Sequence, residues 1–77
     1  MEKRYLIKHY GRSIVVDDSL LMIERKPAGT GIETVVLVYR QTTIEFTVHV
    51  RESISLVKLI VDHMAKLEDT GIIEVTQ

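Results

Sequence analysis

Two glycines and the only proline form the segment whose spacing is most suggestive of ligand binding. This segment, KPAGTGIE, covers residues 26–33 and contains Pro27, Gly29 and Gly31. A phosphate-binding loop opens into a helix, because the free N–H groups at a helix N-terminus hold the anion. Here Gly31 leads into the β-prone run ETVVLVYR. We therefore predict a hairpin connection of about five or six residues and no phosphate site.

Three histidines, His9, His49 and His63, are the side chains best suited to binding a metal ion. They lie far apart in the sequence, whereas zinc ligands usually include a pair separated by only a few residues. The chain contains no cysteine, which excludes disulfides and thiolate metal sites. We therefore expect no metal and no cofactor.

Hydroxyl and carboxylate side chains give no recognisable catalytic arrangement. None of the four serines lies in a G-x-S-x-G sequence, and all lie beside expected strand or helix starts: Ser13, Ser19, Ser53 and Ser55. Glu33 and Glu45 are expected on neighbouring strands. Two carboxylates on an open sheet face form no acid–base pair without a cleft that gives them different environments. We therefore predict that this protein is not an enzyme.

The first twelve residues carry four cations against one carboxylate, whereas the whole chain has a net charge of −1. Cations that alternate with aromatic rings on a sheet bind single-stranded nucleic acid by charge and stacking. Lysine and arginine on an edge strand also protect it from edge-to-edge aggregation. Both interpretations stay open for the residues that this pattern predicts as nucleic-acid contacts, which are Lys3, Arg4, Tyr5, Lys8, Tyr10 and Arg12.

Five β-prone runs precede one helical segment. The runs cover residues 4–10, 13–16, 19–25, 33–40 and 42–50. Asp17 and Asp18 separate the second run from the third. Adjacent aspartates between apolar runs are typical of a tight hairpin turn, because aspartate tolerates unusual backbone angles and bonds its own backbone. We therefore expect consecutive antiparallel strands.

The last two runs differ in the number of their apolar faces. Apolar and polar residues alternate from 43 to 50, which predicts a strand with one buried face. The run at 34–39 is apolar on both faces, with Val36 and Val38 on the second one. A strand of that kind is usually central in its sheet, or covered on its second face by another element. A partner subunit would supply that cover.

After Glu52, apolar residues recur at the spacing of one face of a helix. One apolar stripe is formed by Val57, Ile60, Val61, Met64 and Leu67. Ser53 is expected to cap the start of the helix, and Gly71 is expected to end it. The β-branched segment IIEVT, residues 72–76, predicts a short final strand at a sheet edge.

The expected fold is α+β and forms a single domain over residues 1–77. It consists of an antiparallel β-meander of about five strands, one C-terminal amphipathic helix packed on one face, and the short final strand. The stretch GRSIVVDDSLLMIERK, residues 11–26, resembles the early hairpin of bacterial pleckstrin-homology-like domains. That resemblance implies a small β-barrel plus helix as the alternative fold, and we carry over no binding residues from it.

The composition favours a protein that associates with itself. Of the 77 residues, 26 are Ile, Leu or Val, which is a surplus for one small core. We predict a small non-enzymatic structural or adaptor protein that acts through self-association and protein–protein contacts, with a homodimer as the first expectation and Val36 and Val38 at the interface. The alternative is a nucleic-acid-binding accessory protein that uses the basic N-terminal strand.

No apolar run in the sequence has the length that crossing a bilayer requires. The segment MEKRYLIKHYG lacks the apolar core and cleavage site of a signal peptide. We therefore expect a cytoplasmic location and no membrane partner. Small cysteine-free domains are common among accessory proteins of phages and mobile elements, which is an association and not an inference from these residues.

Overall fold

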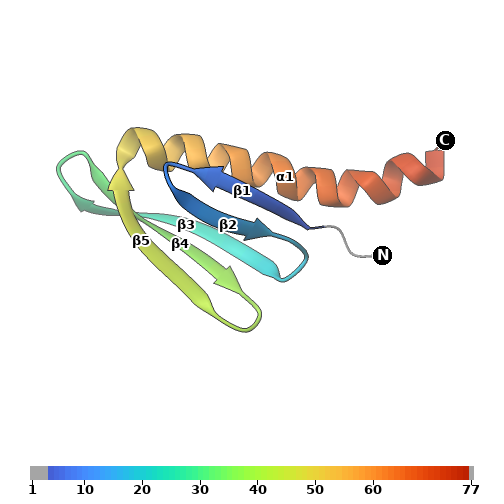
Figure 1. Ribbon diagram of the computed structural model, residues 1–77, viewed down its shortest axis with the longest axis horizontal. Helices are drawn as coiled ribbons and strands as arrows, with labels where there is room; N and C mark the ends of the chain where they lie inside the picture. The colour runs from blue at the N-terminus through green and yellow to red at the C-terminus, as the bar shows by residue number, and fades with distance from the viewer. Residues whose placement is uncertain (1–3, 77) are drawn as a thin grey trace.

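The computed structural model describes the backbone of residues 4–76 and the side chains of residues 4–67. In chain order, its elements are β1 (Tyr5–His9), β2 (Arg12–Val16), β3 (Leu20–Gly29), β4 (Ile32–Tyr39), β5 (Thr43–His49) and α1 (Val50–Thr76). All strand pairs are antiparallel, and the helix follows the strands (Figure 1). The α+β prediction is confirmed.

The strands form two sheets and not one meander. β1 and β2 make a two-stranded hairpin, and β3, β4 and β5 make a three-stranded sheet with β4 at its centre. The prediction of a hairpin turn at Asp17 and Asp18 is therefore wrong, because these residues connect the sheets. A turn does form there, since the Leu20 N–H donates to the Asp17 carbonyl oxygen at 3.2 Å. The described strands also form no closed barrel, so the alternative fold is wrong as well.

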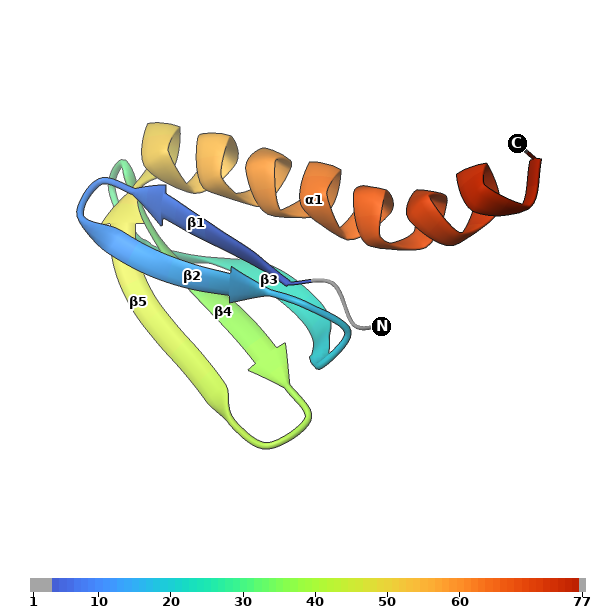
Figure 2. The same cartoon turned by 45° about the vertical axis from the view of Figure 1, so that its right-hand side comes forward.

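Folding the hairpin over the larger sheet encloses a core that one flat sheet would leave exposed. The hairpin, the larger sheet and the helix all contribute to this core, whose buried members are Ile7, Ile14, Val16, Leu20, Val35, Leu37, Val48, Leu56 and Ile60. Helix α1 runs along both sheets in Figures 1 and 2 and contacts strands of each. A second layer from the same chain thus covers the inner face of β4.

The segment KPAGTGIE is a hairpin, as predicted, but its turn is shorter than predicted. β3 continues to Gly29, and only Thr30 and Gly31 connect it to β4. Gly31 has a φ of +69°, which glycine adopts without strain. Pro27 lies within β3, opposite Glu33, where the ladder alternation turns its nitrogen toward the open sheet edge. No ladder hydrogen bond is lost, so the proline is tolerated inside a strand.

The helix is longer at both ends than the sequence predicts. It begins at Val50, so Ser53 lies in its first turn and is not a cap. Gly71 does not end the helix, and the predicted final strand at 72–76 is wrong because α1 continues to Thr76. The 27 residues of α1 span about 40 Å, against about 17 Å for the five residues of β1. The last turns therefore project beyond the sheets, where no strand edge is available for pairing (Figures 1 and 2).

Candidate binding cleft between the two sheets

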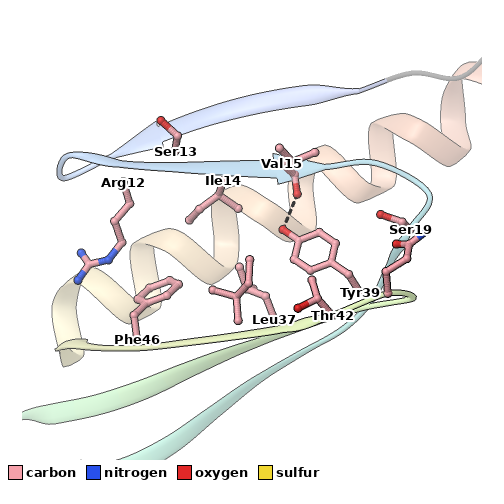
Figure 3. A pocket seen from close by; sticks show the side chains of 11 residues that line it. Arg12, Ser13, Ile14, Val15, Ser19, Leu37, Tyr39, Thr42 and Phe46 are labelled. Atoms are coloured by element: carbon pink, nitrogen blue, oxygen red, sulfur yellow. Dashed lines mark hydrogen bonds between the residues drawn. The ribbon is translucent and has the colours of Figure 1, made fainter.

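An apolar cleft lies between β2 and the strands β4 and β5 (Figure 3). Its volume is about 420 Å³, within the range of small-ligand and peptide sites. The residues that define this inter-sheet cleft are Arg12, Ile14, Leu37, Tyr39, Ile44 and Phe46. Ile14 and Leu37 are core residues that form its floor, whereas Ile44 is 44% exposed at its rim. The cleft forms because the hairpin lies over the larger sheet and none of the described strands of the two sheets pair with each other.

Tyr39 closes one end of the cleft and ties the two sheets together. Its hydroxyl donates a hydrogen bond of 2.6 Å from β4 to the Val15 carbonyl oxygen on β2 (Figure 3). Partial burial raises the pKa of the Tyr39 hydroxyl, and the nearby Asp17 carboxylate adds to that shift. Tyr39 therefore stays protonated, as this donor role requires.

Arg12 lies at the other end of the cleft. Its Cζ atom is 4.7 Å from the centroid of the Phe46 ring, so a cation–π contact spans from β2 to β5 (Figure 3). Among the residues whose side chains the structure describes, it is the only charged one that lines the cleft. In the described part of the chain, the two ion pairs are Arg4 with Asp17 and Arg25 with Glu33, and neither involves Arg12.

The free backbone edge of β2 forms a wall of the cleft. Tyr10 and Gly11 both have positive φ, at 50° and 80°, and His9 pairs with Arg12 across this two-residue turn. Hydrogen-bonded and non-bonded pairs alternate along an antiparallel hairpin, starting with a bonded pair at such a turn. The N–H and C=O groups of Ser13 and Val15 therefore point away from β1, as the hydrogen bond from Tyr39 to Val15 independently requires.

The same alternation identifies the free edge of β5. The Tyr39 N–H donates to the Thr42 carbonyl oxygen at 2.7 Å, and the Val50 N–H donates to the Gly31 carbonyl oxygen at 3.0 Å. Bonded pairs therefore recur at every second residue between these positions, and the backbone groups of Thr43, Glu45 and Thr47 face away from β4. The cleft is thus bordered by two strands, each with an edge that no other described strand pairs.

The connection between the sheets is fixed by the buried residue Asp17. Its carboxylate accepts hydrogen bonds from the Ser19 hydroxyl and from the Ser19 N–H, the latter at 2.9 Å, and lies 3.4 Å from Arg4 Nε. Donation by Ser19, with a smaller contribution from the Arg4 charge, lowers the pKa of Asp17. Asp17 therefore acts as an Asx turn that changes sheets, and not as the predicted hairpin turn.

A second polar contact joins the larger sheet to the first turn of the helix. The Glu33 carboxylate accepts bonds from Arg25 Nε at 2.8 Å and Arg25 Nη2 at 3.1 Å, and it also accepts a bond from the Ser53 hydroxyl. These donors, with Arg25 first, lower the pKa of Glu33. Ser53 is fully buried, so it contributes to docking of the helix where sequence reasoning expected a cap.

The residues predicted to contact nucleic acid do not share one surface. Tyr5 faces inward and packs edge-on against His63, with ring centroids 4.9 Å apart. Arg12 also points inward, over Phe46, whereas Lys8 is exposed on the opposite face of the hairpin. Tyr10 is 68% exposed but lies in the turn, and Arg4 is paired with Asp17. Lys3 lies outside the described residues.

The two predicted interface residues lie on the outer face of the larger sheet, away from the cleft. Val36 is only 4% exposed, although no other layer of the described structure covers it. Its strand neighbours Glu24 and Glu45 flank it on both sides. Val38 is half-buried and lies nearer the end of the face.

The three histidines lie in separate places. His9 Nε2 is 3.2 Å from the Ser55 hydroxyl, and His63 Nδ1 is 2.8 Å from the Leu59 carbonyl oxygen. Over the part of the chain whose side chains are described, no three histidine or carboxylate groups gather as a metal site. The bond between His9 and Ser55, and the packing of His63 against Tyr5, connect the hairpin to α1.

Sequence reasoning missed the inter-sheet cleft, because it assumed that β2 and β3 pair. The sequence did contain one indication of a second sheet above β4, which was the hydroxyl group of the inward-facing residue Tyr39. Tyr39 shares the apolar face of β4 with Val35 and Leu37, and a half-buried tyrosine hydroxyl needs a partner outside its own sheet.

No protein family, no curated protein and no solved structure matches the chain. Among the described residues, no helix combines the length and the apolar character needed to cross a membrane.

Proposed function

We propose that this protein is a small non-enzymatic adaptor that acts through protein–protein contacts and holds an extended partner segment in the inter-sheet cleft. The observation that carries this proposal is an apolar cleft bordered by the β2 edge. The N–H and C=O of Ser13 and the N–H of Val15 pair with no other described strand there, and the Val15 carbonyl oxygen accepts the Tyr39 hydroxyl. A segment that adds to this edge gains main-chain hydrogen bonds, and its alternate side chains enter the apolar floor.

The lining of the cleft favours binding over catalysis. Its polar members are the hydroxyl groups of serine, threonine and tyrosine residues, one amide and one guanidinium, with no histidine or carboxylate among them. General acid–base chemistry near neutral pH relies mostly on histidine or carboxylates with shifted pKa values. Asp17 and Glu33 are engaged in structural contacts elsewhere.

Self-association through the outer face is the second part of this proposal. Val38 and its neighbours on the outer face stay available while the cleft is occupied, because the cleft and this face lie on opposite sides of the larger sheet. A homodimer would then present two clefts to its partner, as an adaptor does.

Binding of a labelled peptide panel tests the cleft. Fluorescein-labelled hexapeptides with alternating apolar and polar residues are titrated with the protein and followed by anisotropy. ¹⁵N chemical-shift perturbation then maps the site. We expect saturable binding with the largest shifts at Ser13, Val15 and Phe46.

A proline substitution separates edge pairing from other modes of binding. Ser13→Pro removes an N–H that faces the cleft without removing a β1–β2 ladder bond, because the Ser13 N–H points away from β1. We expect it to weaken peptide binding by about tenfold or more, whereas Ser13→Ala, which keeps the N–H, changes affinity by less than about twofold. Equal affinities of the two variants, or a panel without any binder, would contradict the proposal.

A further inference from the structure

Arg12 distinguishes one end of the cleft from the other. It lies at the first position of β2, and Phe46 holds its guanidinium inside the cleft. The opposite end holds the neutral residues Tyr39 and Thr42. Within the described lining, the cleft therefore carries a single positive charge at one end and no carboxylate that would neutralise it. A guanidinium stacked on a ring still offers its in-plane N–H groups to an anion.

The direction of β2 determines which end of a bound segment meets this charge. β2 runs from Arg12 to Val16, so an antiparallel segment on its free edge ends beside Arg12. A parallel segment that started beside Arg12 would place its terminal ammonium against the guanidinium. Like charges repel, so charge complementarity selects the antiparallel direction and a carboxylate at the Arg12 end.

We propose that the inter-sheet cleft recognises the C-terminus of a partner protein, bound as an extended strand antiparallel to β2 with its terminal carboxylate on the Arg12 guanidinium. This inference rests on the proposed function, since it specifies the segment that the cleft holds. Charge-assisted hydrogen bonds to a carboxylate are stronger than neutral ones, and the planar guanidinium can make two in parallel.

The register of this segment follows from the free backbone groups. Arg12 turns its own N–H and C=O toward β1, so the first residue of β2 that can pair with a bound segment is Ser13. The last residue of the partner therefore lies opposite Ser13, with its side chain directed outward like that of Ser13. The penultimate residue lies opposite Ile14 and directs its side chain into the floor formed by Ile14 and Leu37. The cleft should therefore select an apolar residue at the penultimate position.

Two hexapeptides of identical composition test this inference. VTVTVT has valine at the penultimate position and TVTVTV has threonine there, and each is prepared as the free acid and as the C-terminal amide. By anisotropy, we expect the free acid of VTVTVT to bind about tenfold more tightly than its amide. We also expect it to bind more tightly than the free acid of TVTVTV.

Variants of Arg12 assign the carboxylate contact. Arg12→Gln should remove the difference between acid and amide, and Arg12→Lys, which keeps the charge, should retain part of it. Circular dichroism shows whether each variant is folded, and the lysine variant keeps the test available if the glutamine variant unfolds. Equal binding of acid and amide, with Ser13→Pro still weakening both, would overturn this inference and leave the proposed function standing. If neither peptide bound and dodecanoate did, the occupant would be an anionic amphiphile and both proposals would fail.

Discussion

Tyr39 links the two sheets directly, because its hydroxyl donates a hydrogen bond from β4 to the Val15 carbonyl oxygen at the end of the cleft. Tyr39→Phe removes the donor and leaves the Val15 carbonyl to solvent. We expect the free energy of unfolding to fall by about 0.5–1.5 kcal/mol, measured by urea denaturation. Tyr5→Phe is the matched control, because Tyr5 uses its ring, against His63, and keeps that contact as phenylalanine. A loss in the control as large as that in Tyr39→Phe would contradict the assignment.

Glu33 makes the free energy of unfolding depend on pH under acidic conditions. Its pKa is lower in the folded protein than the ordinary value of 4.5, because Arg25 and Ser53 donate to the charged form. The folded state therefore binds fewer protons, so this contribution is present above pH 4.5 and is lost as the pH falls through the folded pKa. Asp17 acts in the same direction, because Ser19 and Arg4 lower its pKa.

Removing the Glu33 charge should flatten this dependence. We expect Glu33→Gln to lower the free energy of unfolding at pH 7, and to reduce its slope between about pH 5 and pH 2 in a series of urea titrations. Glu24→Gln removes an equal charge from the exposed outer face, without touching Arg25 or Ser53, and should leave the slope as in the unchanged protein. An identical slope in Glu33→Gln and the unchanged protein would contradict this account.

At the scale of elements, the turn between β3 and β4 depends on one of its two neighbouring glycines. Gly31 has a φ of +69°, whereas Gly29 has no positive φ, and a Cβ added at Gly29 would come no closer than 4.0 Å to Ile32. Gly31→Ala should therefore lower the free energy of unfolding by about 1–2 kcal/mol, because an L-residue is strained in this region. Gly29→Ala should stay within about 0.5 kcal/mol of the unchanged protein in the same urea titration. Equal effects of the two would place the strain elsewhere.

Strand positions were predictable because side-chain alternation is a local property of the chain. Apolar and polar residues alternate along 43–50, and β5 covers Thr43–His49. The double apolar face at 34–39 predicted a strand that is either central in its sheet or covered on its second face, and β4 lies at the centre of its sheet. Both patterns depend only on which faces of a strand are buried, and a single sequence carries that information.

Sheet partners and helix ends were not predictable in the same way, because they depend on residues distant in the sequence. Asp17 forms the same local turn whether the next strand pairs with β2 or joins another sheet, so its pattern could not distinguish these outcomes. Ser53 has the side chain of a cap, but its partner is Glu33, twenty positions earlier in the chain. Only the packed fold brings these two side chains together.

At the scale of the whole molecule, one helix and two sheets enclose a core without help from another chain. Each of the three layers contributes buried side chains to it, among them Ile7, Leu37 and Ile60. The sheets remain unpaired with each other, and the cleft is the consequence of that. Pairing of β2 with β5 would join the two sheets, satisfy both of the strand edges that border the cleft and leave no site there for an added strand. The candidate site is thus produced by the topology and not by a motif.

Self-association across the outer face of the larger sheet stays a prediction, and the structure decides which variant tests it. Val36 is only 4% exposed, so Val36→Lys would disturb the fold itself and could lose a dimer for that reason alone. Val38 is half-buried near the end of the same face, where a lysine stem can reach solvent.

We expect sedimentation velocity at micromolar concentration to give a dimer for the unchanged protein and a monomer for Val38→Lys. Leu6→Lys, on the outer face of the hairpin, is the matched control and should remain a dimer. A monomer in the unchanged protein would remove the outer-face interface and leave peptide binding in the cleft unaffected, because the two surfaces lie on opposite sides of the larger sheet.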